Sequence, residues 1–185
     1  MEKIWFSALF FTVSFPILAQ FEEVKQMADA YYQSQSDKYD RKLYNLASRD
    51  HGKIKESDPV HMFEMQLIRK DKNPETGRKT KAYLTIYGYQ DAEECRAATD
   101  FWFKRFIGNG SIRPNRKSKI QYTESYYYIM VNQTYLLIVD IPCMDWEIEE
   151  WNMLKKSLLH IFEEKNSKAI EIDCKGQVLW SLNSY

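Results

Sequence analysis

The chain has 185 residues, and 44% of them are hydrophobic, enough for a globular core but too few for a polytopic membrane protein. Its 26 Lys and Arg residues balance 26 Asp and Glu residues. Because a nucleic-acid-binding domain is normally strongly basic, we expect no nucleic-acid partner. The balance does not exclude a local anion-binding site.

The first 19 residues have the order of a secretory signal peptide. A short charged start is followed by the uncharged stretch Ile4–Leu18 and by the small residue Ala19. The apolar stretch is shorter than the roughly 20 residues of a membrane span. We therefore predict a signal peptide over 1–19, cleaved near Ala19, and a single secreted or periplasmic domain over 20–185. The alternatives are a buried N-terminal helix or strand and an uncleaved anchor, which would be the only route to a membrane.

Hydrophobic periodicity predicts the first elements of the mature chain. Residues 21–33 have helical spacing, whereas 37–56 combine helical spacing with a break at 50–52. Residues 62–70 and 82–88 alternate between apolar and polar, which predicts a β-hairpin with its turn at 73–77. A capping box formed by Asp91 and Glu94 then begins a helix, which we expect to end at 108–110.

A similar set of elements follows. Residues 120–131 and 134–141 favour two strands joined at Asn132 and Gln133, and we expect Asp145 to cap a second helix. The last segment predicts a hairpin or one bent strand. The sequence thus predicts an α+β fold with an N-terminal helix. Its antiparallel sheet is built from two ββα units plus a terminal strand or hairpin, with the helices mainly on one face.

The three cysteines give an odd count for an exported chain. Cys143 follows an apolar run and Cys174 lies in the last strand-like segment, so we favour a Cys143–Cys174 disulfide with Cys95 left free. Three buried thiols are the alternative.

No motif in the sequence identifies a catalytic, metal or cofactor site. His51, His61 and His160 lack the spacing of metal ligands, and nucleophile elbows, C-x-x-C pairs and phosphate-binding loops do not occur. Glu147, Glu149 and Glu150 are typical of the start of a helix. A zinc site or a Cys143–His61 pair would have to assemble through the fold, so we name no catalytic residue, metal or cofactor.

Two features favour ligand binding. Alternation places Tyr83 and Tyr87 on the sheet face opposite Leu84 and Ile86, where Tyr126 and Tyr128 are expected to join them. Exposed tyrosine rings on a sheet can stack on sugars. The alternative is that these rings pack in the core.

The second feature is a pair of basic segments. Residues 69–81 hold six Lys and Arg residues against Asp71 and Glu75, and 108–120 hold no acidic residue. If both loops lie at one end of the sheet, they would attract an anionic polysaccharide, a phosphate-bearing glycan or a membrane surface. Ordinary charged loop tips are the alternative. The basic candidates of the second loop are Arg113, Arg116, Lys117 and Lys119.

Two glycosylation sequons, at Asn109 and Asn132, also fall in predicted turns. Taken together, the sequence favours a non-catalytic exported module that binds an anionic or carbohydrate ligand. The alternative is a small secreted hydrolase whose catalytic residues converge only in the fold. A pocket that holds at least two histidines, thiols or buried carboxylates would favour the hydrolase.

Overall fold

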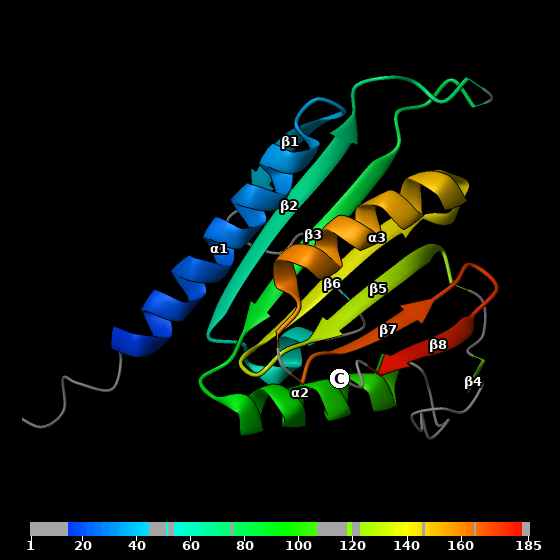
Figure 1. Ribbon diagram of the computed structural model, residues 1–185. Coiled ribbons are helices and arrows are strands. Elements are labelled where there is room, and N and C mark those ends of the chain that lie inside the picture. The colour runs from blue at the N-terminus through cyan, green and yellow to red at the C-terminus, as the bar shows by residue number, and fades with distance from the viewer. Residues whose placement is uncertain are drawn as a thin grey trace, which may run out of the picture.

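The structure, a computed structural model, describes residues 15–44, 51, 54–74, 76–106, 118–119, 123–145, 147–164 and 166–182. In these ranges it holds an eight-stranded antiparallel sheet in the order β1-β2-β3-β6-β5-β7-β8-β4 (Figure 1). The strands are β1 (Tyr39–Tyr44), β2 (His61–Arg69), β3 (Lys81–Gly88), β4 (Ser118–Lys119), β5 (Ser125–Val131), β6 (Tyr135–Pro142), β7 (Lys168–Ile172) and β8 (Gln177–Leu182). The helices are α1 (Phe15–Gln35), α2 (Ala92–Phe106) and α3 (Ile148–Phe162), with short 3-10 helices η1 (Ile54–Ser57) and η2 (Cys143–Asp145).

Both faces of the sheet are covered by helices. In Figure 1, α1 and α3 lie next to each other over one face, and α2 runs below the sheet. Two clusters of buried side chains correspond to these layers, one under α1 and α3 and one under α2. The predicted α+β class is confirmed, with two of the described α-helices on one face. The helices that end the two ββα units, α2 and α3, lie on opposite faces.

Helix α1 confirms the predicted N-terminal helix and extends it at both ends. Its apolar positions Val24, Ala28 and Tyr31 are buried against the sheet and α3. The helix is continuous across Ala19, the expected cleavage site, and residues 1–14 lie outside the described part of the chain. In that described part, no helix has the length and apolar character needed to cross a membrane.

The segment after α1 is a strand, which the helical spacing within 37–56 did not predict. β1 pairs with β2 in antiparallel register, Arg41 opposite Leu67. Tyr39 is 1% exposed in the core under α1. Alternation from Tyr39 to Leu43 suits a strand whose inner face packs under a helix, and tertiary packing decides between the two patterns.

The predicted hairpin of β2 and β3 is confirmed. The two strands pair with Met65 opposite Leu84, and their apolar side chains join the core under α1 and α3. Asp91 also caps α2 as expected, because its Oδ1 accepts hydrogen bonds from the backbone N–H groups of Glu93 and Glu94. The carboxylate of Glu94 in turn accepts one from the Gln90 N–H. The expected stop at 108–110 lies outside the described residues.

The second half departs from the prediction at β5, which begins at Ser125 rather than at residue 120, and at the start of α3. β5, β6 and the hairpin of β7 and β8 are present, but Asp145 does not cap α3. The N-cap is Glu147, which makes no side-chain capping hydrogen bond. Asp145 instead ends η2, and this extra turn separates β6 from the helix. The apolar side chains of α3 at Trp151, Leu154, Leu158 and Phe162 are buried, whereas Ile148 is 60% exposed.

Candidate functional site

A polar pocket of about 220 Å³ lies where α1 ends, β1 begins, β2 ends and α3 begins. Residues from all four elements converge on it because the chain crosses this end of the sheet at each of these points. We call it the Glu150 pocket. It is lined by Gln35, Lys38, Tyr39, Arg69, Asp71, Glu147, Glu149, Glu150, Met153 and Leu154.

Glu150 is the buried acid of this pocket, with 8% of its surface exposed. The hydroxyl of Tyr39 donates a hydrogen bond to its Oε1, and Arg69 Nη1 lies 2.9 Å from its Oε2. Arg69 also lies 3.6 Å from Glu147 Oε2, and Asn73 donates to the other oxygen of Glu147. Each oxygen of Glu150 thus has its own donor, which fixes the carboxyl group in one orientation.

The electrostatics of the pocket favour neutral or positively charged ligands. Burial raises the pKa of the Glu150 carboxyl above its ordinary value, and the positive charge of Lys38 acts in the opposite direction. Four acidic residues line the pocket against the two basic residues Lys38 and Arg69. An anion would therefore meet net repulsion here.

Sequence reasoning did not find this site. It assigned Glu147, Glu149 and Glu150 to a helix start, and the structure does place them there. The partners of Glu150 lie 111 and 81 residues away along the chain, at Tyr39 and Arg69. No local pattern connects positions so far apart, and Tyr39 lies in the segment whose strand was not predicted.

The predicted tyrosine face is not an exposed surface. Tyr87 does point to the face opposite Leu84, as expected, but it is fully buried under α2. Tyr126 and Tyr128 lie on the other face, under α3, so the expectation that they join Tyr83 and Tyr87 is wrong. The register of β5 against β6 explains the error. It places Tyr127 on the α2 side together with Tyr87, so Tyr126 and Tyr128, on either side of Tyr127, point to the opposite face. Tyr83 remains half-buried.

His51 lies inside the protein rather than in an exposed loop. Its Nδ1 is 2.8 Å from the Tyr87 hydroxyl, and its Nε2 is 3.1 Å from Asp140 Oδ1. A carboxylate only accepts hydrogen bonds, so Nε2 is the donor to Asp140, and the Tyr87 hydroxyl is the partner of Nδ1. The imidazole is 3% exposed, and Trp102 donates its indole N–H to the His51 carbonyl. The network ties the segment before η1 to the sheet and α2.

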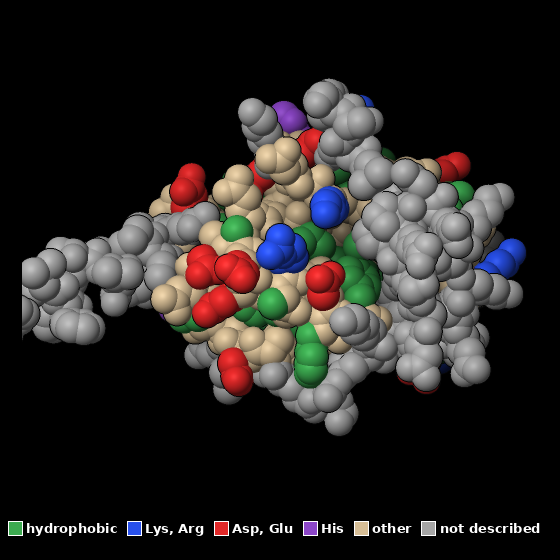
Figure 2. Space-filling model, turned by 90° about the horizontal axis from the view of Figure 1, so that it is seen from below, with side chains coloured by type: hydrophobic (Ala, Val, Ile, Leu, Met, Phe, Trp, Pro, Cys, Tyr) green, Lys and Arg blue, Asp and Glu red, His purple; other side chains and the backbone are tan. Residues whose placement is uncertain are grey.

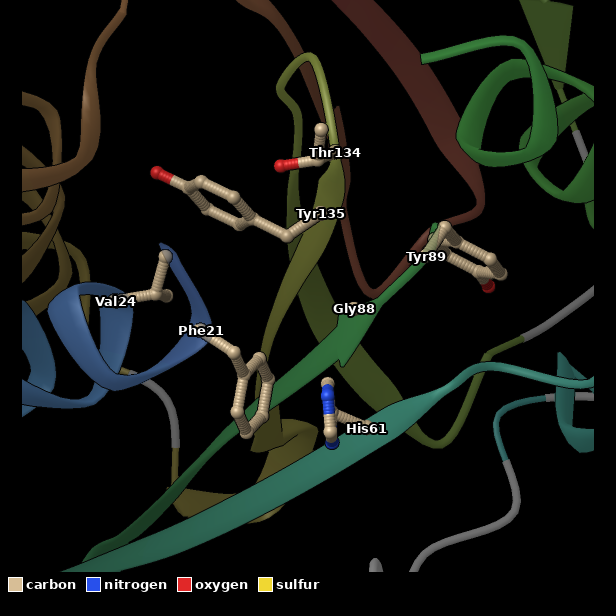
Figure 3. A pocket seen from close by; sticks show the side chains of 7 residues that line it. All are labelled: Phe21, Val24, His61, Gly88, Tyr89, Thr134 and Tyr135. Atoms are coloured by element: carbon tan, nitrogen blue, oxygen red, sulfur yellow. The ribbon is translucent and has the colours of Figure 1, made fainter. Parts of the chain in front are cut away.

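His61 has a packing role at the opposite end of α1. Its ring stacks on Phe21 with centroids 4.7 Å apart, as Figure 3 shows. The hollow that these two rings help to line measures only about 10 Å³. A Cβ atom on Gly88 would lie 2.9 Å from the Phe21 ring, so a glycine is needed for this close approach. His160, in contrast, is exposed on α3, so the three histidines have three different environments.

A second hollow lies on the α2 side, the side that faces the viewer in Figure 2. It measures about 400 Å³, opens broadly to solvent, and is lined by Ser57, Asp58, Glu94, Ala97, Ala98 and Phe101. Its lining is mainly apolar but includes two acids and a serine. In contrast with the Glu150 pocket, no buried charged group is held there by donors from other elements.

The cysteines and the Asn132 sequon are the other residues that the sequence singled out. Cys143 and Cys174 form a disulfide with their Cα atoms 5.7 Å apart, and Cys95 is a buried free thiol. Asn132 is 6% exposed, and its Nδ2 donates to the Phe162 carbonyl at 3.0 Å. The turn prediction is therefore right, but the Asn132 side chain is buried and is not presented to solvent for glycosylation.

Of the two basic segments, 69–81 lies almost wholly within the described residues. In the 69–81 segment the basic side chains that follow Arg69 are exposed. In the other segment, Asn109, Arg113, Arg116 and Lys117 lie outside the described residues, and Lys119 is described only as part of β4. In the described part of the chain, no group of three or more His, Cys, Asp or Glu side chains could hold a metal ion.

Comparison with known proteins finds no matching family model, no matching curated protein and no matching solved structure.

Proposed function

We propose that the protein is an exported, non-catalytic binding module that holds a neutral or amine-bearing carbohydrate in the Glu150 pocket. The observation that carries this proposal is the Glu150 carboxyl, buried at a 220 Å³ pocket and fixed by Tyr39 and Arg69. A rigid polar group in a concave pocket is typical of a recognition site. The signal-like N-terminus supports export.

The lining of the pocket suits a sugar. Gln35, Lys38 and Arg69 offer donors, and the carboxylates of Asp71 and Glu149 offer acceptors, so hydroxyl groups that both donate and accept can be matched. Met153, which is 51% exposed, adds apolar surface for the C–H groups of a pyranose. The acidic excess favours an amino sugar over an acidic one.

The binding interpretation is favoured over catalysis by the composition of the pocket. Glu150 is its one buried carboxylate, and neither a histidine nor a cysteine lines it. The criterion for a hydrolase, two or more such groups in one pocket, is therefore not met there. The basic loops stay a separate prediction for anionic ligands.

Calorimetric titration of the mature chain with neutral, amino and acidic sugars tests the proposal. We expect the Glu149→Gln, Asp71→Asn double variant to weaken binding of an amino sugar by about tenfold. Both side chains are exposed, so thermal stability should not change. The Glu93→Gln, Asp100→Asn variant, with two exposed acids of α2, is the matched control. Equal affinity of the two double variants, or no binding in the panel, would overturn the proposal.

The raised pKa of Glu150 favours one second candidate, a hydrolase that uses this carboxyl as a general acid. Incubating the protein with the sugar that it binds, and measuring product release, distinguishes the hydrolase from the binding module. Wild-type protein that releases a product, with the release lost in Glu150→Gln, would establish the hydrolase. Binding without any product would retain the binding module.

A further inference from the structure

Strand β1 presents a row of backbone groups that point away from the sheet. Among the described strands it pairs with β2 alone. The Lys70 N–H donates to the Lys38 carbonyl at 2.9 Å, and hydrogen-bonded pairs alternate along an antiparallel ladder. Asp40 and Lys42 therefore use their backbone groups toward β2. The N–H and C=O groups of Tyr39, Arg41 and Leu43 point outward.

The side chains of β1 divide by face. Tyr39 is buried under α1, and Arg41 pairs with Asp29 of α1 and lies 4.5 Å from the Tyr32 ring centroid. On the other face, Asp40 and Lys42 are exposed and form no ion pair in the described structure. Leu43 lies on the same face as Tyr39 and Arg41, and its apolar side chain is 53% exposed at the strand edge.

This strand is complementary to itself in one register. When two copies pair antiparallel, outward-pointing residues must face outward-pointing residues. When Arg41 of one copy faces Arg41 of the other, every outward-pointing residue of the strand faces another outward-pointing residue. Asp40 of each copy then faces Lys42 of the other, so this opposite-charge pair occurs twice. The neighbouring allowed registers, centred on position 40 or 42, set Asp40 opposite Asp40 or Lys42 opposite Lys42. Directly opposed like charges destabilise a strand pair.

We propose that the protein forms a twofold-symmetric dimer in which β1 pairs antiparallel with β1 of a second copy, centred on Arg41. The two sheets then become one continuous sheet. Each Arg41 keeps Asp29 of its own chain as a partner, which reduces the repulsion at the centre. Leu43, which is 53% exposed, then lies opposite Tyr39 of the second copy, next to the new strand pair. A self-complementary patch of this kind is what a twofold interface requires.

Sedimentation equilibrium of the mature chain tests the dimer and its edge. We expect a monomer–dimer equilibrium that Arg41→Pro abolishes, because proline removes an outward N–H without touching the ladder to β2. Arg41→Ala removes the same side chain and keeps the N–H, so it should still dimerise. A protein that is monomeric at all concentrations, or an Arg41→Pro variant that dimerises like Arg41→Ala, would overturn the proposal.

Charge exchange tests the register. Asp40→Lys and Lys42→Asp each set like charges against each other and should weaken dimerisation by about tenfold, and their combination should restore it. Cysteine substitution gives a direct check under mild oxidation: Arg41→Cys should form an intermolecular disulfide, since facing Cα atoms of a hydrogen-bonded pair lie about 5.5 Å apart. Faster disulfide formation by Asp40→Cys or Lys42→Cys would contradict the register.

Discussion

Two neighbouring tyrosines of β5 differ in what their hydroxyl groups contact. The Tyr126 hydroxyl donates to Glu171 Oε2 at 2.6 Å. The buried hydroxyl of Tyr128 has no hydrogen-bond partner in the structure as described. Both rings contact Trp151, with centroids 4.4 and 5.9 Å apart. The pair therefore separates the effect of a hydroxyl from that of a ring.

We expect Tyr126→Phe to lower the free energy of unfolding by about 2 kcal/mol, because it removes a hydrogen bond to a charged acceptor. Tyr128→Phe should leave it unchanged or raise it by up to about 1 kcal/mol, because it removes a buried polar group without a partner. Urea unfolding followed by tryptophan fluorescence measures both. Equal destabilisation by the two variants would mean that the Tyr128 hydroxyl is paired.

The sequence predicts the surroundings of individual residues less well than it predicts helices and strands. The environments of Glu150 and His51 depend on Tyr39, Arg69, Tyr87 and Asp140, which reach them only after the sheet has formed. Alternation did assign Tyr87 to the correct face. It could not tell that α2 would cover that face, because burial depends on where a distant helix packs.

Among the elements, α2 has a cap that local sequence specifies completely. Asp91 accepts from the N–H groups of Glu93 and Glu94 at 2.8 and 2.9 Å. We expect Asp91→Ala to cost about 1 kcal/mol, or about 2–4 °C in Tm, since two N–H groups at the helix start lose their acceptor. Asp100→Ala, another exposed acid of α2, should change Tm by less. Thermal melts followed by circular dichroism give both values, and equal shifts would argue against the cap.

The accuracy of the element predictions follows from how local their causes are. Strong periodicity and turn chemistry predicted α1, α2 and the hairpin of β2 and β3, where the stabilising contacts agree with the local pattern. β1 and the start of α3 were missed. In β1 packing under α1 overrides the helical spacing, and at α3 the insertion of η2 moves the helix start from Asp145 to Glu147.

Over the whole molecule, five buried tyrosines and the buried free thiol make the fold sensitive to alkali. Burial raises the pKa of the Cys95 thiol from 9.0 to about 12 and that of the Tyr89 phenol from 10.0 to about 12. Burial acts in the same direction on further phenols of the core under α1 and α3, at Tyr31, Tyr126, Tyr128 and Tyr135. The folded protein thus holds these protons more tightly than the unfolded chain does.

The sign of the pH dependence follows from this difference. Where the folded state binds more protons, stability falls as pH rises. The contribution of these groups is complete below pH 9, where the unfolded thiol and phenols are also protonated, and it is lost between about pH 9 and 12 and above. We expect the urea midpoint to fall steadily over this range.

Phenolate absorbance distinguishes this mechanism from general charge repulsion. If burial holds the protons, the absorbance of the buried tyrosines should rise in one cooperative step that coincides with the loss of near-ultraviolet circular dichroism. The chain in guanidinium, where every phenol is exposed, should instead titrate smoothly near pH 10. A native protein whose tyrosines all titrate near pH 10, with its circular dichroism unchanged, would show that the core phenols are accessible to hydroxide. The packing of α1 and α3 over β5 and β6 would then be looser than the buried cluster of tyrosines indicates.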